Sequence, residues 1–269
     1  MPNFNRLLLT GAAGDIGKHL RKTLASQTTH LRLTDRMPMG DAAPHEEIFE
    51  TDLGVLEPVL KMTRDVDAIV HFGGASRERV WEDILNSTIQ GSYNIYEAAR
   101  KNGVKRVVFA SSIHAVGYTP VEDVPDTRAP HRPDTLYGLS KCFVEDLARL
   151  YFDKYGIETV ALRICSCFSH PVERRQLWSW LSYDDCTRLV ISALSAPRVG
   201  FSVIYGTSGN SERGVSNVHA THIGYAPQDS ADPYRDAVET STERPNPHED
   251  KVKYVGGWFT ELGHPDDDA

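Results

Sequence analysis

The chain lacks any long apolar segment. None of the apolar runs in its 269 residues approaches the roughly 20 residues that a helix needs to span a bilayer. At the N-terminus, Met1 to Arg6 leads directly into a predicted strand and leaves no room for a signal peptide. We therefore expect neither a membrane-spanning helix nor an export signal.

Clustered positive charge is also missing. The formal net charge is -8, and the sequence has neither a long basic run nor basic residues interleaved with aromatic ones. Nucleic acids and anionic membranes attract proteins through such basic surfaces, so both are excluded as partners. The sequence also has no internal repeat, which excludes repeat architectures.

Cysteine is scarce and does not follow a metal-binding pattern. The four cysteines are Cys142, Cys165, Cys167 and Cys186. They lack the paired spacing of zinc ligands, so we expect no metal site. We interpret them as reduced thiols in a cytoplasmic protein.

A glycine-rich segment follows the first predicted strand, the apolar run Arg6–Thr10. The first glycine permits a tight turn, the second the close approach of a pyrophosphate, and the third the packing of a helix on the strand. Amide groups at the helix start would face the anion. The residues expected at the phosphates are Gly11, Gly14, Asp15, Ile16 and Gly17. The alternative is a tight strand–helix turn without a ligand.

Acidic residues end the next two predicted strands. Asp35 lies about 20 residues beyond the glycines, where an acidic side chain accepts hydrogen bonds from the adenosine ribose and repels a 2′-phosphate. This favours NAD over NADP, although the neighbouring Arg36 is of the type that accommodates a phosphate. Asp52 and Leu53 are candidates for the adenine pocket, with a helix N-cap as the alternative role for Asp52.

The fourth and fifth predicted strands also end in candidate site residues. Phe72, Gly73 and Gly74 lie at the carboxyl end of the fourth, where the ligand crevice of such sheets is found, and Ser76 follows within reach of a bound ligand. The fifth strand ends at Ser112. A long loop, residues 113–133, comes next, and we expect it to face the substrate.

Tyr137 and Lys141 are four residues apart at the start of a predicted helix that ends near Tyr155, so they share one face. A tyrosine is a poor acid or base at neutral pH because its pKa is about 10. A nearby ammonium favours the phenolate and lowers that pKa. Alone, the pair is also compatible with a solvated helix face, so its weight depends on the rest of the chain.

The alternation of six strands and helices predicts a doubly wound parallel sheet, the Rossmann fold. The sixth strand, Glu158–Ile164, is followed by a less regular part of the chain. We expect an NAD-binding domain over residues 1–168 that carries the catalytic residues, a smaller substrate-binding portion over 169–262, and a disordered tail over 263–269.

The spacing of the three glycines, with Ser112, Tyr137 and Lys141, resembles the extended short-chain dehydrogenase/reductase superfamily. A closer resemblance, over nearly the full length, is to the uronate dehydrogenase family. It rests on the segments His71–Ser76, Phe109–His114, Leu136–Phe143, Ala148–Gly156 and Arg163–Ile164, and on Ser166-Cys167 and Arg174-Arg175. Members of that family oxidise the anomeric carbon of glucuronate or galacturonate with NAD and give an aldarolactone.

The resemblance implies a role for each candidate residue. Tyr137 as phenolate would take the proton of the anomeric hydroxyl, Ser112 would orient that oxygen, and Lys141 would hold down the tyrosine pKa and bind the nicotinamide ribose. Arg175 would bind the substrate carboxylate, with Arg174 as its rival. The expected substrate contacts are Ser76, Ser112, Ile113, His114, Tyr137, Ser166 and Arg175, and Ile164 completes the cofactor contacts. Ile113 departs from the family pattern, which has asparagine there.

Two other classes remain open. A sugar-nucleotide epimerase or dehydratase would use the same tyrosine with a tightly held NAD, but it needs a larger C-terminal domain. A non-catalytic dinucleotide-binding regulator would tend to lose the tyrosine or the lysine. The long predicted helices over 81–102 and 135–155 are candidates for contacts in a homo-oligomer.

Overall fold

The computed structural model describes residues 4–267, which form two compact units. Unit 1 contains residues 4–110, 143–161 and 197–202. Unit 2 contains residues 111–142, 162–196 and 203–267. The predicted division at residue 168 and the predicted disorder of the tail stay predictions; residues 268–269 of that tail lie outside the described residues.

Within residues 4–267 the main sheet has seven strands in the order β3-β2-β1-β4-β5-β6-β9. Their bounds are β1 Phe4–Thr10, β2 Thr28–Asp35, β3 Glu46–Glu50, β4 Ala68–His71, β5 Arg106–Ser112, β6 Glu158–Ile164 and β9 Phe201–Gly206. The pairs β1–β2, β1–β4, β2–β3 and β4–β5 are parallel. The strand order reverses on either side of β1, as in a doubly wound sheet, and the predicted fold class is confirmed.

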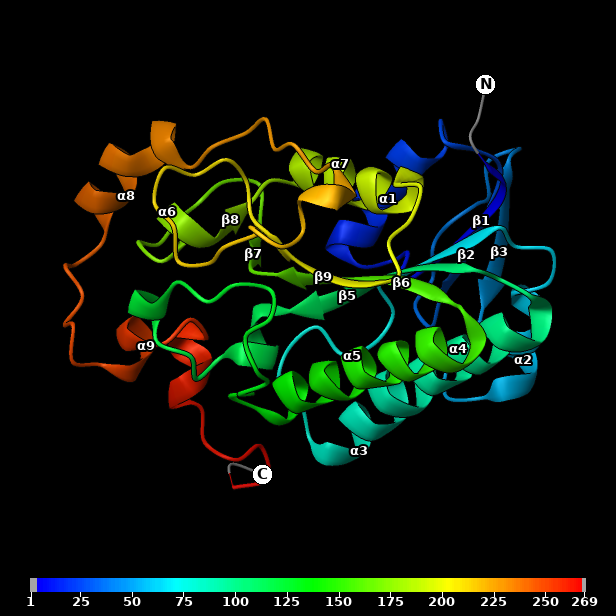
Figure 1. The fold of residues 1–269 in the computed structure, drawn as a ribbon, viewed down its shortest axis with the longest axis horizontal. Helices are drawn as coiled ribbons and strands as arrows, with labels where there is room; N and C mark the ends of the chain where they lie inside the picture. Colours follow the sequence, from blue (N-terminus) through cyan, green and yellow to red (C-terminus); the bar gives the residue numbers. More distant parts are fainter. Residues whose placement is uncertain (1–3, 268–269) are drawn as a thin grey trace. The chain divides into compact units, whose positions relative to one another are not determined.

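Apolar runs on these strands form the core of unit 1. Leu7, Leu8 and Leu9 of β1 are all completely buried, as are Ile69 and Val70 of β4. Burial of consecutive side chains requires that both faces of the sheet be covered, as is usual for parallel sheets. Figure 1 shows α1 (Asp15–Leu24) on one side of β1 and β2, and α2 (Leu56–Met62) and α4 (Gly91–Asn102) on the other.

The prediction of one long helix over Trp81–Asn102 is wrong for its middle part, which is π-helical. The helical segment consists of α3 (Trp81–Ile84), the π-helical segment η1 (Leu85–Gln90) and α4, which ends at the left-handed Gly103. π-Helical turns in helices are frequent at functional sites. Here the segment places the hydroxyl of Thr88 where it accepts a hydrogen bond from the Ala75 amide, 3.0 Å away, beside the glycine pair of the predicted ligand loop.

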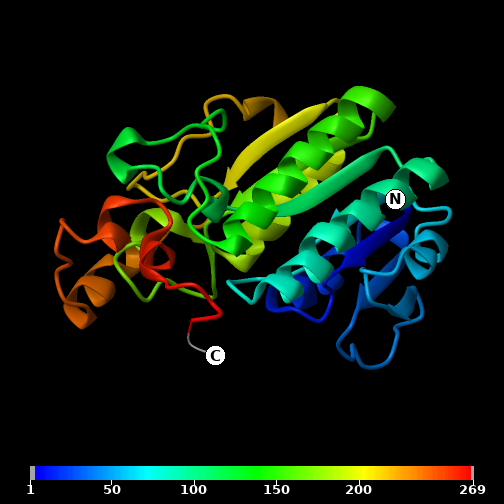
Figure 2. The same cartoon turned by 90° about the horizontal axis from the view of Figure 1, so that it is seen from below.

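Helix α5 (Leu136–Tyr155) matches its prediction. Its first turn is capped by Thr135, whose hydroxyl accepts a hydrogen bond from the Gly138 amide. From residue 143 onward α5 belongs to unit 1 and lies beside α4 (Figure 2). There the rings of Tyr96 and Tyr151 are 5.5 Å apart.

Unit 2 contains short elements joined by long loops. They are η2 Ile113–Val116, η3 Val121–Asp123, β7 Ser166–Cys167, α6 Gln176–Ser179, β8 Trp180–Leu181, α7 Tyr183–Ser195, η4 Thr221–Ile223, η5 Asp232–Tyr234, α8 Arg235–Ser241, α9 Asp250–Lys253 and η6 Gly257–Glu261. Pro120 of the long loop forms an antiparallel bridge with Tyr254. Ile113, Val116, Tyr205, Val215 and Val255 form an apolar cluster at this junction. The loop over residues 113–133 is therefore held in place by contacts with Tyr254 and Val255 of the C-terminal segment.

None of the helices over residues 4–267 has the length and apolar character needed to cross a membrane.

Candidate active site

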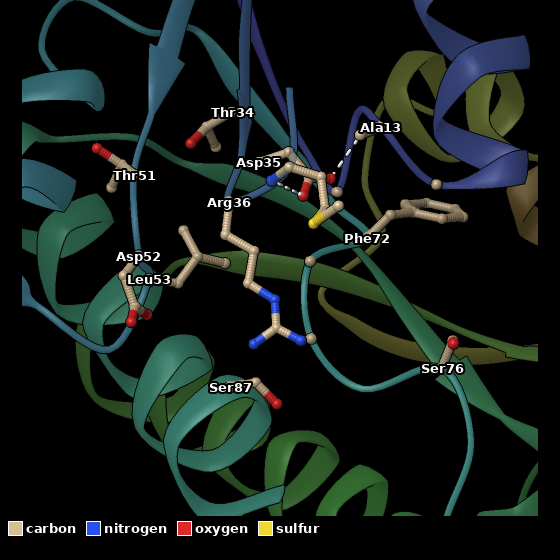
Figure 3. Close-up of a pocket in the computed structure, with 15 residues that line it drawn as sticks. Ala13, Thr34, Asp35, Arg36, Thr51, Asp52, Leu53, Phe72, Ser76 and Ser87 are labelled. Atoms are coloured by element: carbon tan, nitrogen blue, oxygen red, sulfur yellow. Dashed lines mark hydrogen bonds between the residues drawn. The ribbon is translucent and has the colours of Figure 1, made fainter. Parts of the chain in front are cut away.

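Unit 1 contains a cavity of about 270 Å³ at the carboxyl ends of β1, β2 and β4. Figure 3 shows the residues around it. They are Gly11, Ala13, Gly14, Thr34, Asp35, Arg36, Met37, Thr51, Asp52, Leu53, Phe72, Gly73, Gly74, Ser76 and Ser87. This is the switch point of the sheet, where open α/β folds bind their ligands.

The glycine-rich turn between β1 and α1 has no space for a Cβ at its first and third glycines. Gly11 has a φ of +72°, and a Cβ there would lie 2.5 Å from the carbonyl oxygen of Phe72. A Cβ on Gly17 would lie 2.0 Å from the carbonyl oxygen of Gly11. The first glycine is therefore required by conformation and by space, and the third by the packing of α1 against the turn. No side chain caps the start of α1, where Gly14 is the N-cap residue. Its first amides remain available to an anion.

Asp35 is held in place by two main-chain amides, one of them in the same turn. One carboxylate oxygen accepts a hydrogen bond from the Ala13 amide, and the other accepts one from the Met37 amide, each over 3.0 Å (Figure 3). Each oxygen keeps a lone pair for a ribose hydroxyl. The Arg36 side chain extends from the end of β2 into the space between the labelled residues (Figure 3).

Asp52 does not cap a helix, which answers the alternative left open by the sequence. The N-cap residue of α2 is Val55, and no side chain caps that helix. Asp52 instead accepts a hydrogen bond from the Gly54 amide at 2.8 Å and faces the cavity. Leu53 is fixed because its carbonyl accepts a hydrogen bond from Asn94, and its side chain lies where a Cβ on Gly73 would clash, at 2.6 Å.

Most of the predicted cofactor residues therefore surround one cavity. Of the others, Asp15, Ile16 and Gly17 begin α1 beside it, whereas Lys141 and Ile164 belong to unit 2. Ser76, predicted to contact the substrate, also lines this cavity. The sequence reasoning missed Ala13, Thr34, Met37, Thr51 and Ser87. The first four are next to, or two residues from, predicted site residues in the chain, which could have indicated them. Ser87 has no predicted site residue next to it.

In unit 2 the start of α5 lies against the end of β5. Tyr137, Ser112 and Lys141 are all buried, and the Ser112 hydroxyl is hydrogen-bonded to that of Tyr137. The Lys141 ammonium lies 5.3 Å from the centre of the Tyr137 ring. The structure thus brings the three predicted catalytic side chains together.

The pKa of Tyr137 departs from its usual value in the direction opposite to that expected from a neighbouring lysine alone. Burial raises the pKa of Tyr137 to about 12, against the lowering effect of the hydrogen bond to Ser112, and the charge of Asp134 raises it further. In the protein without ligands, the tyrosine is therefore held as a neutral phenol.

His114 lies beside this tyrosine and is fixed on several sides. Its ring meets that of Tyr137 edge-on, with centres 5.7 Å apart, and stacks on Phe259 at 3.8 Å. Its Nδ1 is 2.7 Å from an oxygen of Asp134, and its amide donates a hydrogen bond to the Ser112 hydroxyl at 3.3 Å.

Arg175 is a partly buried guanidinium without an acidic partner. Its Nε and one terminal nitrogen donate to the carbonyl oxygen of Val255, and the other terminal nitrogen donates to the Ser166 hydroxyl at 3.0 Å. None of the described carboxylates lies within ion-pair distance of it, and burial lowers the pKa of Arg175. Three of its five N–H groups are used, so one remains on each terminal nitrogen.

Arg174, the rival for the same role, is engaged elsewhere. It donates to the carbonyl oxygens of Glu239, Thr242 and Glu243, and it lies 4.0 Å from the Glu239 carboxylate. Arg174 therefore stabilises the main chain at the C-terminal end of α8 and just after it.

Two further predicted substrate contacts differ in their surroundings. Ser166 is buried, bonded to Ser179 at 2.9 Å and to Arg175. Ile113 is completely buried, and its side chain packs into the apolar cluster with Val116 and Val255. Isoleucine is thus accommodated as a core residue beside Ser112, and its predicted contact with the substrate has no support in this packing.

The sequence reasoning missed Asp134, Val255 and Phe259. Asp134 lies three residues before Tyr137, but the residues just before a helix suggest caps rather than site residues. Val255 and Phe259 lie in the C-terminal segment, far from every motif. A glycine pair, Gly256-Gly257, was the one local signal there.

Known proteins are similar to this chain in sequence and in fold. Residues 7–182 match the model of the NAD dependent epimerase/dehydratase family. The uronate dehydrogenase of Pseudomonas putida is 49% identical over 261 residues, which cover 97% of each chain. The crystal structure of glucuronic acid dehydrogenase from Chromohalobacter salexigens superposes with a TM-score of 0.96 at 47% identity, over 98% of this chain and 99% of that one.

A mutant uronate dehydrogenase from Agrobacterium tumefaciens, solved as a complex with NAD, superposes with a TM-score of 0.94 at 42% identity, over 97% of this chain and 98% of that one. Similarity at this level over nearly the whole of each chain confirms the resemblance predicted from the motifs. The chain belongs to the uronate dehydrogenase family, within the NAD dependent epimerase/dehydratase family.

Proposed function

We propose that this protein oxidises the anomeric carbon of a hexuronate, glucuronate or galacturonate, to the aldarolactone. The observation that carries the proposal is Arg175, a partly buried guanidinium with free N–H groups and no described acidic partner, in the same unit as the Ser112–Tyr137–Lys141 group. A cation in such surroundings suits a substrate that brings its own carboxylate.

The reaction removes a proton from the anomeric hydroxyl and a hydride from the anomeric carbon. Tyr137, as phenolate, takes the proton of the anomeric hydroxyl, while the hydrogen on that carbon leaves as hydride and the C–O single bond becomes a carbonyl. NAD supplies the hydride acceptor when bound. Because the anomeric carbon is part of a ring, its oxidation gives a lactone.

The surrounding residues prepare Tyr137 for this step. Ser112 bonds the Tyr137 hydroxyl in the structure, and it orients the substrate oxygen at the same position. The ammonium of Lys141 stabilises the phenolate and offsets the opposing effect of burial. His114 and Ser166 bind sugar hydroxyls.

The cofactor is NAD. The turn of Gly11, Gly14 and Gly17 accepts the pyrophosphate, and Asp35 accepts hydrogen bonds from the adenosine ribose. Asp52, which lines the same cavity, binds the adenine amine. We also propose a cytoplasmic location and a homo-oligomer that associates through its long helices.

The decisive test is the appearance of NADH absorbance when the protein is mixed with NAD and one sugar at a time. We expect turnover with glucuronate, galacturonate or both, much less with glucose, and none with UDP-glucuronate. Glucose lacks the carboxylate, and UDP-glucuronate has its anomeric oxygen blocked. Absence of NADH with both uronates would overturn the proposal, and turnover of the nucleotide sugar would point to the epimerase-like alternative.

A further inference from the structure

The dinucleotide cavity of unit 1 contains a cation that the proposed binding of NAD does not use. Arg36 is the one basic side chain among the described residues that line this cavity. It directly follows Asp35, the last residue of β2, and the carboxylates of Asp35 and Asp52 line the same cavity. Both carboxylates have a role in the binding of NAD, whereas Arg36 has none.

The guanidinium of Arg36 is not held by the protein. It makes no hydrogen bond, ion pair or ring contact with any residue over 4–267. The two carboxylates are instead held by the main chain, since both oxygens of Asp35 and one oxygen of Asp52 accept hydrogen bonds from amides. Figure 3 shows the Arg36 side chain pointing into the cavity and away from the Asp35 carboxylate. The N–H groups of this guanidinium are therefore available to a ligand.

A phosphate group is the ligand that suits this side chain. An arginine guanidinium is planar and always charged, and its fork of donors binds two phosphate oxygens at once. In dinucleotide-binding folds the acidic residue at this strand end contacts the 2′-hydroxyl of the adenosine ribose, and an arginine nearby accommodates a 2′-phosphate. The pyrophosphate belongs to the glycine-rich turn, so the phosphate left for Arg36 is the one on the ribose.

Asp35 opposes the binding of a 2′-phosphate. Its carboxylate is fixed by two amides and cannot turn away, and its charge repels a phosphate. The charge of Arg36 attracts the same phosphate and offsets this repulsion. NAD receives the hydrogen bonds of Asp35 without the repulsion, so it stays the preferred cofactor, and NADP is bound more weakly instead of being excluded.

We propose that the protein also uses NADP, as a second and weaker cofactor whose 2′-phosphate is bound by Arg36. The reaction is the same with either cofactor. The hydride of the anomeric carbon passes to the nicotinamide of NADP, the proton of the hydroxyl passes to Tyr137, and the lactone and NADPH are formed. The inference rests on the proposed function for the identity of the sugar, but the binding of the phosphate concerns unit 1 alone.

The first test measures binding in the absence of a sugar. The protein is titrated with NADH and with NADPH, and the fluorescence of the reduced nicotinamide reports binding. Arg36→Ala should lower the affinity for NADPH about 10- to 100-fold, the range for lost hydrogen bonds that involve a charged group, and the affinity for NADH far less. Equal losses for both would place Arg36 at the adenine or the pyrophosphate and would overturn the proposal. A failure of the unmodified protein to bind NADPH would overturn it too.

Arg64→Ala is the matched control. Arg64 is another exposed arginine of unit 1 whose side chain has no partner in the described part of the chain, but it does not line the cavity. The variant should bind both reduced dinucleotides as the unmodified protein does. An equal loss of NADPH affinity in Arg64→Ala and Arg36→Ala would show a general effect of a removed positive charge and would contradict a specific role of Arg36.

The second test measures turnover. With a uronate as substrate, kcat/KM for NADP should be about 10- to 1,000-fold lower than for NAD, the effect of one repelling charge a few Å from the phosphate. Asp35→Asn should narrow this difference because the amide removes the repulsion. Absence of NADPH formation under conditions that give NADH would overturn the proposal. If neither uronate gives NADH, the proposed function fails, and the titrations with NADH and NADPH still decide whether Arg36 binds the 2′-phosphate.

Discussion

The dinucleotide cavity of unit 1 is formed mainly by main-chain groups, whereas the Tyr137 site of unit 2 is formed mainly by side chains. The cavity is formed by short stretches that each follow a strand, and its decisive features are main-chain amides and glycines. The Tyr137 site is formed by side chains from the end of β5, the start of α5, the Ser166–Arg175 region and the C-terminal segment. Arg175 donates a hydrogen bond to the carbonyl oxygen of Val255, which lies 80 residues further along the chain.

Glycine illustrates the difference. Gly11 of the cavity has a positive φ, so its need for glycine is a property of the local backbone. Gly117 and Gly256 of the Tyr137 site have negative φ angles, and their need for glycine is imposed by the side chain of Asp134, whose Oδ2 would lie 2.0 or 2.1 Å from a Cβ at either position. A binding site made of main chain is thus determined locally, whereas one made of side chains depends on distant partners.

The largest expected effect separates the two regions. Tyr137→Phe should lower kcat about 100- to 10,000-fold, the contribution usual for general acid–base catalysis, because the base is removed. The affinity for NAD, measured by calorimetric titration, should be unchanged, since Tyr137 does not line the dinucleotide cavity. Tyr155→Phe, at the exposed end of the same helix, is the control and should be fully active. Normal turnover of Tyr137→Phe would refute its role as the base.

The opposite result is expected from the glycine-rich turn. Gly17→Ala places a methyl group 2.0 Å from the carbonyl oxygen of Gly11, and neither backbone can move freely. Overpacking of this kind costs about 3 kcal/mol at its upper end, which corresponds to about 100-fold in NAD affinity. Gly263→Ala has no atom within 4 Å of the added methyl group and should bind NAD normally. Full NAD affinity of Gly17→Ala would show that the turn is not the phosphate site.

Arg175→Ala tests the carboxylate end of the Tyr137 site. Loss of a hydrogen-bonded charge partner costs about 2 kcal/mol, so KM for the uronate should rise about 30-fold, with little change in kcat and NAD affinity. Arg174→Ala is the matched control, since Arg174 bonds carbonyl groups around α8. A larger increase of KM for Arg174→Ala would transfer the role to that residue, and an equal loss for glucose and uronate would argue against carboxylate binding.

The smallest expected effect concerns stability at high pH. The pKa of Tyr137 is raised to about 12 in the folded protein, against about 10 in an unfolded chain. The neutral phenol therefore stabilises the fold fully below pH 10, and this contribution is lost as the pH rises toward 12. Denaturant unfolding at several alkaline pH values should show a steeper loss of stability in the unmodified protein than in Tyr137→Phe.

The variant Ser112→Ala gives a second test of the raised pKa of Tyr137. The hydrogen bond from Ser112 lowers the pKa of Tyr137, so its removal should extend the loss of stability to still higher pH. Parallel stability curves for all three proteins would contradict the raised pKa of the buried phenol.

The same contrast explains what the sequence could predict. The strands, α5 and the cofactor residues followed from apolar periodicity, glycine spacing and the place of Asp35 at a strand end, all of which are local signals. Tyr137 and Lys141 were found by their spacing on the predicted helix, and the resemblance to the superfamily joined Ser112 to them. The π-helical segment before Gly91 was missed because its hydrogen-bond pattern leaves no mark in apolar periodicity.

Residues that act through tertiary contacts could not be predicted. Asp134 was missed because its burial is created by Gly117 and Gly256, which lie on other segments. Phe259 was missed because its stacking on His114 joins residues that no periodicity connects. Ile113 was placed at the substrate because the family pattern has asparagine at this position, whereas the isoleucine side chain packs into the apolar cluster.

The oxygen Oδ2 of Asp134 makes three positions genetically dependent on one another. The Cβ of an alanine at residue 117 or 256 would lie 2.0 or 2.1 Å from this atom, far inside van der Waals contact, so either change alone should impair folding. Replacement of Asp134 by glycine removes the whole side chain, including the Cβ that would lie 2.7 Å from a Cβ at residue 117. It should act as a second-site suppressor that restores folding without restoring activity. In a population of variants, glycine at these two positions should therefore be inherited together with the carboxylate, and alanine should be found there only where the side chain at residue 134 is gone.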